Sequence, residues 1–239
     1  MKNINEIAFI IQSRKGSVRV KNKMLKPFND SSLFEIAIKK ILKSKIIPKE
    51  NFYVSVLDDE FKDIAKKYDI NIYHRSSEST VEPVELPTVF GWYKEGSLNK
   101  PYKYWVTING CNPLLSIDTI DRFVESFLNT DSNGAFGVFE KKTFLFNNEG
   151  IMLNRFFGED KYLATLETKY VETCYEAAHS LYAGTMEDIG NEIYTGTFKE
   201  AGNPEFFIMD EIECFDIDWP FQFEIAETMY KQRKNQIWS

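Results

Sequence analysis

Histidine and cysteine are scarce in this sequence. Its 239 residues include two histidines, His74 and His179, and three widely separated cysteines, Cys111, Cys174 and Cys214. An odd number of distant cysteines predicts reduced thiols and no disulfide framework. So few nitrogen and sulfur ligands argue against a zinc or iron centre, and they leave oxygen-ligated Mg²⁺ as the metal to expect.

Long apolar runs and an excess of positive charge are also lacking. No run approaches the roughly 20 residues that a membrane span needs, and the polar residues 1–6 lead straight into a strand-like segment, unlike a signal peptide. We therefore expect a cytoplasmic protein with no membrane partner. The net charge of −7 argues against nucleic-acid binding as the main function. With 43% hydrophobic residues the chain can bury one sizeable core, so residues 1–239 are expected to form a single domain.

Strand-like and helix-like segments alternate along the first half of the chain. The expected strands cover residues 6–12, 52–57, 70–73 and 104–108, and the expected helices cover residues 33–45, 59–68, 83–93 and 117–128. This alternation predicts the α/β class, with a mainly parallel sheet and helices on both faces. Ligands of such sheets bind beyond the carboxyl ends of the strands, so the loops at 12–26, 74–75 and 109–113 should converge on one site.

The second half is less regular. Residues 129–202 are rich in aromatic residues and contain short strand-like pieces such as 134–139. We interpret residues 130–200 as a small β-rich lobe that leaves the main sheet. Helical spacing returns at residues 223–231.

A basic loop follows the first expected strand. It contains Arg14, Lys15, Arg19, Lys21, Lys23 and Lys26 in an otherwise acidic chain. A triphosphate carries about four negative charges, and it needs cations and backbone N–H groups that can approach closely, which Gly16 permits. The loop matches neither the Walker pattern nor the dinucleotide-binding pattern. On composition alone, a solvated charge run explains the loop equally well.

Two aspartates, Asp216 and Asp218, are separated by one residue near the end of the chain. On an extended segment their side chains point to the same side, where two carboxylates can bind Mg²⁺ through oxygen atoms. A surface strand end is the alternative, and composition alone favours it. We interpret the preceding acids, Asp210, Glu211 and Glu213, as a solvated run.

The loop resembles the N-terminal signature of a known family. The pattern Arg14-x-Gly16-Ser17-x-Arg19 with Lys23, followed by Leu25-x-Pro27-Phe28, is similar to that of the acylneuraminate cytidylyltransferases (CMP-sialic acid synthetases) and of their relatives that activate 3-deoxy-manno-octulosonate. The similarity continues through residues 73–75, 109–114, 216–218 and 223–227, and it is weakest in the middle of the chain.

The resemblance implies a fold, an activity and a set of partners. The fold would be a Rossmann-like nucleotidyltransferase fold in which the lobe helps to form a homodimer. The reaction would be Mg²⁺-dependent transfer of CMP from CTP to the anomeric hydroxyl of a sialic-acid-like or other acidic sugar, with release of pyrophosphate.

The same resemblance implies roles for individual residues. The nucleotide would be bound by Arg14, Gly16, Ser17, Lys23, Arg75 and Asn109. The acceptor would be bound by Asn109, His179 and Tyr182, and its carboxylate by Arg155 or Lys169. Asp216 and Asp218 would hold the metal and, with Arg14 and Lys23, form the catalytic set. His179 and Tyr182 also fit purely structural roles, as a lone histidine or a core tyrosine often does.

Four positions depart from the family pattern. Met24 replaces an asparagine that recognises the base, so the preference for cytosine stays open. Cys111 replaces a metal-binding aspartate of the octulosonate enzymes, which points to the sialic-acid-like branch. Asn109 stands where the family has glutamine, and Gln222 stands where many relatives have a third acid.

Three alternatives stay open. One is a nucleotidyltransferase of the same fold that uses another nucleotide or a non-sugar acceptor, and the second is a glycosyltransferase in which Asp216-x-Asp218 is the metal motif. The third is a nucleotide-binding relative without turnover, which Met24, Cys111 and Gln222 make conceivable. The glycosyltransferase motif normally ends an earlier strand, and that alternative leaves the basic loop unexplained.

Overall fold

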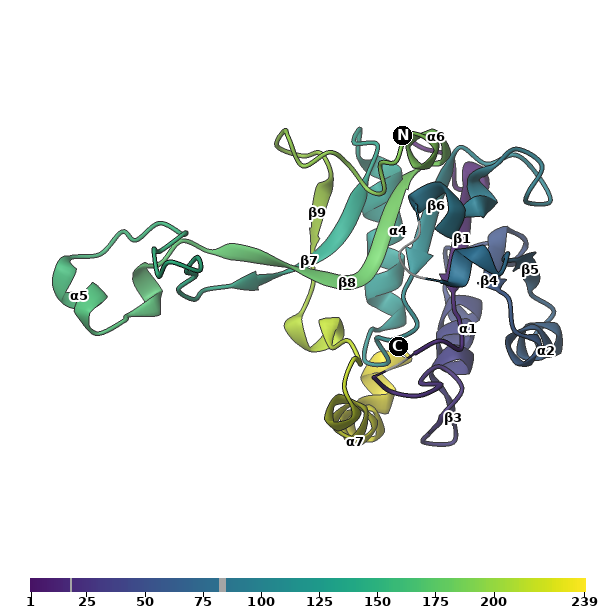
Figure 1. Ribbon diagram of the computed structural model, residues 1–239, viewed down its shortest axis with the longest axis horizontal. Coiled ribbons are helices and arrows are strands. Elements are labelled where there is room, and N and C mark those ends of the chain that lie inside the picture. The colour runs from purple at the N-terminus through teal and green to yellow at the C-terminus, as the bar shows by residue number, and fades with distance from the viewer. Residues whose placement is uncertain (18, 82–84) are drawn as a thin grey trace.

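A seven-stranded sheet forms the centre of the protein. The computed structural model describes residues 1–17, 19–81 and 85–239, and within them the strand order is β5-β4-β1-β6-β8-β7-β9 (Figure 1). The strands are β1 (Ile7–Gln12), β4 (Phe52–Val56), β5 (Asn71–His74), β6 (Tyr104–Ile108), β7 (Ala135–Lys141), β8 (Cys174–Thr185) and β9 (Glu205–Ile208). Every neighbouring pair is parallel except the pairs made by β8, which runs opposite to β6 and β7. The expected α/β class with a mainly parallel sheet is confirmed.

The sheet is covered on both faces, which explains why β1 is apolar from Ile7 to Ile11. Phe9 and Ile11 of β1 face a large core. The helices on that side are α1 (Leu33–Lys43), α2 (Asp59–Lys67), α4 (Ile117–Asn129) and α7 (Pro220–Ile237). Ala8 and Ile10 face a smaller aromatic core, to which α3 (Leu86–Val89), a 3-10 turn (Gly91–Tyr93) and α6 (Met186–Gly190) contribute. None of the described helices is long and apolar enough to cross a membrane.

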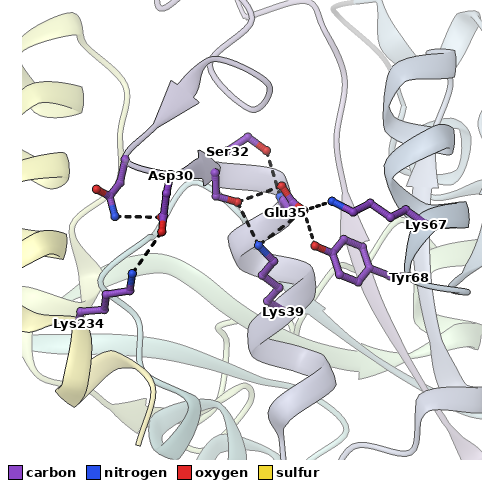
Figure 2. A network of polar contacts seen from close by, with 9 residues as sticks. Asp30, Ser32, Glu35, Lys39, Lys67, Tyr68 and Lys234 are labelled. Atoms are coloured by element: carbon purple, nitrogen blue, oxygen red, sulfur yellow. Dashed lines mark hydrogen bonds and ion pairs between the residues drawn. The ribbon is translucent and has the colours of Figure 1, made fainter.

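The short antiparallel pair β2 (Pro27–Phe28) and β3 (Ser31–Ser32) follows the basic loop, and helix α1 begins directly after β3. The Ser32 hydroxyl caps the helix by accepting the N–H of Glu35 at 3.3 Å. The Glu35 carboxylate accepts hydrogen bonds from Lys67 and Tyr68 at the end of α2, as Figure 2 shows. This carboxylate therefore fixes the start of α1 against α2.

The helix expected at residues 83–93 is broken in the described part of the chain. Residues 82–84 lie outside the described residues, and after them α3 spans only Leu86–Val89 before the 3-10 turn. The side chain of Trp92 turns inward and is 1% exposed, with its ring 5.8 Å from that of Trp105. Burial of this large ring overrides the helical pattern.

The segment expected to leave the sheet does so only in part. β7 and β8 belong to the main sheet, and residues 142–173 between them project as an arm (Figure 1). The first five residues of β7 are buried, so they need neighbours on both sides. The arm contains α5 (Asp160–Ala164), a 3-10 turn (Thr168–Tyr170) and isolated bridges such as Phe146 with Met152. The β-rich part of this region is therefore sheet, and the arm is mostly irregular.

Candidate active site

The loops after β1, β5 and β6 meet at the carboxyl edge of the sheet, as expected. They surround a cavity of about 600 Å³, lined among others by Arg14, Arg75, Asn109, His179, Tyr182, Asp216 and Asp218. A second cavity of about 320 Å³ shares Gln12, Ser13, Arg14, Arg19 and Asp218 with the first, and it adds Gly16, Ser17 and Lys23. Every residue predicted to bind the nucleotide or the metal, together with His179 and Tyr182, therefore lines one of two adjoining cavities.

Two arginines form one wall. Arg14 donates a hydrogen bond to the carbonyl of Thr80 at 2.6 Å. Arg75 is buried, and its guanidinium donates to the hydroxyl of Ser79 at 3.1 Å and to the Ser79 carbonyl. Burial lowers the pKa of Arg75 to about 10, and the positive charge of Arg14 adds to this effect. Arg75 stays charged at neutral pH, so an anion bound between the two guanidinium groups relieves their repulsion.

A second set of cations lies around Asp218. Arg19 forms an ion pair with its carboxylate at 2.8 Å, and the Lys23 ammonium lies 3.3 Å from the same oxygen. Lys23 also donates to the carbonyl of Ile217. Burial lowers the pKa of Lys23, but its neighbours Cys111, Asp216 and Asp218 together raise it by more, so the net shift is upward. Lys23 is thus a charged group held at the centre of the site.

Asp216 has an unsatisfied oxygen atom. Its Oδ1 atom is buried and has no hydrogen-bond partner within the described residues. Burial raises the pKa of this carboxyl, although the nearby Lys23 opposes the shift. A bound cation would satisfy such an oxygen. No group of three or more histidine, cysteine, aspartate or glutamate side chains forms a metal site in the described parts of the chain. Mg²⁺, however, is usually held by one or two carboxylates together with substrate phosphates and water, so Asp216 and Asp218 fit it.

Gln222 has a structural task at this site. Its side-chain oxygen accepts the N–H groups of Asp218 and Trp219, both at 2.7 Å. Trp219 is the N-cap of α7, and Pro220 follows in the first turn, where a missing N–H is tolerated. The amide oxygen thus caps the helix and fixes the backbone of Asp218.

Asn109 joins two strands at the cavity. Its amide nitrogen donates to the carbonyl of His179 at 2.7 Å, and its amide oxygen accepts the N–H of Cys111 at 3.0 Å. Its backbone N–H donates to the carbonyl of Ser180 at 2.8 Å. Both ends of the side chain are therefore used within the protein, which favours a positioning role over direct contact with a ligand.

The segment that Asn109 holds is a bulge in β8. Phe136 pairs with Tyr182 whereas Val138 pairs with Ala177, so residues 178–181 of β8 lie opposite the single residue 137 of β7. His179 within the bulge has a φ of 50°, a left-handed conformation that is uncommon outside glycine. The bulge places the Nδ1 atom of His179 2.7 Å from the hydroxyl of Tyr182, and both side chains line the cavity.

Met24 and Cys111 fill the space below the basic loop. Met24 is 5% exposed, and the Cys111 sulfur lies 3.6 Å from the Met24 sulfur. A Cβ added to Gly110 would lie 2.5 Å from the terminal carbon of Met24, so the methionine uses the room that this glycine leaves. Burial raises the pKa of the Cys111 thiol to about 11, which keeps it protonated at neutral pH.

Gly16 does not owe its place to an unusual backbone conformation. A Cβ at this position would meet only the side chain of Arg14, at 3.9 Å. Ser17 next to it donates its backbone N–H to the carbonyl of Lys15 at 2.7 Å. Close approach of a ligand to the backbone remains the predicted reason for Gly16.

The interpretation of Glu213 as a solvated acid was wrong. Its side chain is buried, and its two oxygens accept the N–H of Ser116 at 3.0 Å and the hydroxyl of Thr119 at 2.6 Å. It thereby caps α4 from the last 3-10 turn before the aspartate pair. Asp210 and Glu211 are exposed, as expected.

The sequence interpretation missed Ser13 and underrated Arg19. Ser13 lines both cavities and is 4% exposed, yet its hydroxyl has no hydrogen-bond partner within the described residues. Its position between Gln12 and Arg14, at the carboxyl end of β1, was the available signal. Arg155 and Lys169, the two candidates for the sugar carboxylate, lie on the arm and line neither cavity.

A cationic cavity with a carboxylate pair, placed at the carboxyl edge of an α/β sheet, defines a protein that handles phosphate groups, and the whole arrangement is that of a nucleotidyltransferase. The chain matches the family described as Cytidylyltransferase over residues 8–237. It therefore belongs to the cytidylyltransferase family and is a nucleotidyltransferase.

Two further relatives match part of the chain. The uncharacterized protein MJ1063 of Methanocaldococcus jannaschii is 29% identical over 127 residues, which cover 52% of this chain and 48% of that protein. The spore coat polysaccharide biosynthesis protein SpsF of Bacillus subtilis is 26% identical over 132 residues, covering 54% and 53%. The chain thus spans about half the length of these two relatives.

Solved structures of low sequence identity share the fold. A CMP:2-keto-3-deoxy-manno-octonic acid synthetase complexed with CTP has a TM-score of 0.63 at 11% identity, over 95% of this chain and 99% of that one. A 4-diphosphocytidyl-2C-methyl-D-erythritol synthase from Anaerococcus prevotii has a TM-score of 0.64 at 14% identity, over 94% and 96%. These likenesses confirm the expected nucleotidyltransferase fold.

Proposed function

We propose that this protein transfers CMP from CTP to the anomeric hydroxyl of a sialic-acid-like or other acidic sugar, releases pyrophosphate and requires Mg²⁺. Membership of the cytidylyltransferase family supports the nucleotide. The resemblance of the basic loop to that of the sugar-activating enzymes supports the acceptor. The polysaccharide role named for the SpsF relative agrees with a product used in building a surface glycan.

One observation carries the proposal: two adjoining cavities bring together the arginine pair, Lys23 and the two aspartates. A triphosphate and a divalent cation need these two kinds of group in one place. A solvated loop would spread its charges over the surface. Here Arg14, Arg19 and Lys23 of the loop all line the cavities.

In the proposed reaction, the anomeric oxygen of the sugar attacks the α-phosphorus of CTP and the bond to the bridging oxygen of pyrophosphate breaks. The sugar hydroxyl loses its proton to solvent water, and pyrophosphate leaves with the electron pair. Catalysis of this kind depends on positioning and on neutralising charge, so no nucleophilic side chain is required. Arg14, Arg75 and Lys23 orient the phosphates and compensate the negative charge that develops on the leaving group.

Asp216 and Asp218 would hold Mg²⁺, which when bound supplies positive charge to the phosphate oxygens. Lys23 and Arg19 are already in contact with Asp218. These two contacts orient the Asp218 carboxylate at the edge that the two cavities share. Gln222 holds the backbone of Asp218 in place from the start of α7.

We place the acceptor in the larger cavity, beside His179 and Tyr182, which both line it. Burial raises the pKa of Tyr182 to about 12, so its hydroxyl stays protonated and can donate a hydrogen bond to a sugar oxygen. The Ser13 hydroxyl, buried and without a partner among the described residues, is proposed as a further contact to the nucleotide.

We assign the arm to a homodimer. Its exposed apolar side chains include Leu145, Phe146, Ile151, Leu153 and Phe157. Apolar side chains gathered on a projecting segment are unfavourable in water, and a second copy of the chain would cover them. Arg155 and Lys169 lie on the same arm and line neither cavity of their own chain. If they bind the sugar carboxylate, a partner subunit must supply them.

Pyrophosphate release tests the reaction directly. We expect release when CTP is combined with one of a panel of nonulosonic acids and Mg²⁺, and less release with ATP, GTP or UTP. Asp218→Asn should abolish turnover while circular dichroism shows an intact fold. Asp118→Asn on the exposed face of α4 is the matched control and should keep full activity. Absence of release with every nucleotide and acceptor would exclude the proposal and favour a relative that only binds.

The glycosyltransferase alternative has less support. Asp216 and Asp218 follow the last described strand and directly precede the C-terminal helix, whereas a glycosyltransferase motif ends an earlier strand. The match to the cytidylyltransferase family over residues 8–237 also favours the nucleotidyltransferase.

A further inference from the structure

A separate cavity lies between α1 and α7. Its volume is about 520 Å³, within the range of about 300–1,000 Å³ that is common for small-molecule sites. None of its lining residues lines either of the two cavities of the candidate active site. It therefore belongs to a different surface of the protein.

The inner part of this cavity is apolar and aromatic. Ile36 and Tyr230 are both 2% exposed, and Leu42 and Trp238 are half-buried beside them. The indole N–H of Trp238 donates to the Tyr230 hydroxyl at 3.0 Å, which fixes the orientation of the indole. A fixed aromatic plane is a surface on which a flat ring can stack.

Three lysines surround this aromatic surface. Lys39 and Lys234 reach two adjacent residues at the start of β3. The Lys39 ammonium lies 3.5 Å from the Ser31 hydroxyl, and the Lys234 ammonium lies 3.4 Å from the Asp30 carboxylate (Figure 2). Lys43 lies one helical turn beyond Lys39, with its ammonium 4.9 Å from the centre of the Trp238 ring.

The charges of the lining residues are unbalanced. Lys39, Lys43 and Lys234 face only one lining carboxylate, that of Asp30, whose side chain is 71% exposed. Glu35 also approaches Lys39, at 3.5 Å, but it is shared with Lys67 of α2 at 2.9 Å. In a chain of net charge −7, such a surplus of lysines around an apolar hollow is a local exception.

We propose that this cavity binds a small organic anion that carries a phosphate group and a planar ring. The ring stacks against Trp238 and Leu42, and the phosphate is held by the ammonium groups of Lys39, Lys43 and Lys234. Lysine binds phosphate as a point charge, so three flexible lysines accept a phosphate without a fixed two-point geometry. The site is independent of the proposed transferase activity.

Pyridoxal 5′-phosphate is the probe, because it combines a planar ring, a phosphate and an aldehyde that reacts with amines. The lysine amine condenses with the aldehyde and releases water, and borohydride reduces the resulting C=N bond to a stable amine. Peptide mapping then identifies the labelled lysines. We expect saturable labelling of Lys39, Lys43 or Lys234 at concentrations at least tenfold below those that label Lys66, an exposed lysine of α2.

CTP separates this site from the active site. It should protect Lys23 from labelling and leave the three lysines of the α1–α7 cavity unprotected. If CTP did not protect Lys23 from labelling, that result would count against the proposed transferase function and not against the α1–α7 site. Protection of the cavity lysines by CTP would overturn the independent site.

Two variants test the ring surface. Trp238→Ala should raise the half-saturating concentration for the cavity lysines at least tenfold, while Trp238→Phe, which keeps a ring, should restore most of the affinity. Labelling that does not saturate, or that is equal at Lys66, or that is unaffected by Trp238→Ala in a folded protein, would overturn the proposal.

Discussion

The side-chain amide of Asn109 donates a hydrogen bond to the backbone carbonyl of His179, at 2.7 Å, across the junction of β6 and β8. This bond holds a bulge in which His179 has a left-handed backbone conformation. Such a conformation costs on the order of 1 kcal/mol or more, so it persists only where neighbouring groups maintain it. Asn109 is the neighbour that does so.

Asn109→Ala should therefore impair the acceptor side of the site. Removing the amide leaves the His179 carbonyl and the Cys111 N–H without their partners, at a cost of about 1–3 kcal/mol. We expect kcat/KM for the acceptor to fall roughly 5- to 150-fold. The dissociation constant of CTP, measured by titration calorimetry, should change less than threefold. If CTP affinity and kcat/KM for the acceptor fell by the same factor, a role of Asn109 confined to the bulge would be contradicted.

A matched control for this variant is Asn129→Ala. Asn129 also donates its amide to a backbone carbonyl, that of Glu125 at 2.9 Å, but it lies at the end of α4 and lines neither cavity. Removing the Asn129 amide should leave kcat/KM for the acceptor and the dissociation constant of CTP unchanged. An equal effect on the acceptor would show that the Asn109 result reflects a general loss of stability.

Arg14→Ala should weaken CTP binding in a salt-dependent way. Loss of one charged partner of a phosphate costs about 1.5–3 kcal/mol, which corresponds to a 10- to 150-fold increase in the dissociation constant. Because the lost interaction is electrostatic, the difference from wild type should shrink as salt rises. Arg122→Ala, which removes an exposed arginine paired with Asp118, is the control and should bind CTP normally. Unchanged affinity in Arg14→Ala would reject its assigned role.

Much of the site could be predicted because its parts are local in sequence. The basic loop, Arg75 and Asn109 each follow an apolar strand, and parallel strands bring their carboxyl ends to one edge. The roles of Gln222 and Glu213 could not be predicted, because each depends on which backbone N–H groups lie beside it in space. The same holds for Trp92, whose burial against Trp105 interrupts an expected helix. The extent of β7 and β8 depends on partners 20 or more residues away in the chain.

Gln222→Ala should affect both the helix and the metal site. The variant removes the acceptor of the Asp218 and Trp219 N–H groups and should lower the free energy of unfolding by about 1 kcal/mol, as other N-terminal capping losses do. With Asp218 less constrained, the Mg²⁺ concentration that gives half-maximal turnover should rise severalfold. Gln222→Glu keeps the accepting oxygen and should restore stability, as measured by urea unfolding. If Gln222→Ala kept the wild-type Mg²⁺ dependence of turnover, the helix cap would have no role in Mg²⁺ binding.

The arm should control the oligomeric state. Replacing Phe146 and Leu153 by aspartate places charges on two side chains of the arm that are 53% and 65% exposed. If the arm joins two copies, light scattering should show a dimer for the wild type and a monomer for the double variant. The double variant Phe221→Asp and Ile225→Asp, at two exposed apolar residues of α7 outside the arm, should remain dimeric. A wild-type monomer at all concentrations would exclude the dimer.

The stability of the protein should depend on pH through Glu35. Its carboxylate accepts hydrogen bonds from Tyr68, Lys67 and Ser31, and these, led by the Tyr68 hydroxyl, lower its pKa from 4.5 to about 2 (Figure 2). A lowered pKa stabilises the folded state above pH 4.5, and this contribution disappears as the pH falls from 4.5 toward 2. Glu35→Gln should therefore lower the free energy of unfolding at pH 7 by about 1–3 kcal/mol, measured in urea. The difference in the free energy of unfolding between wild type and Glu35→Gln should be smaller at pH 3 than at pH 7. Glu125→Gln, at an exposed position of α4, should show no difference at either pH, and a Glu35→Gln effect that is equally large at pH 3 and pH 7 would contradict the assigned ionic origin.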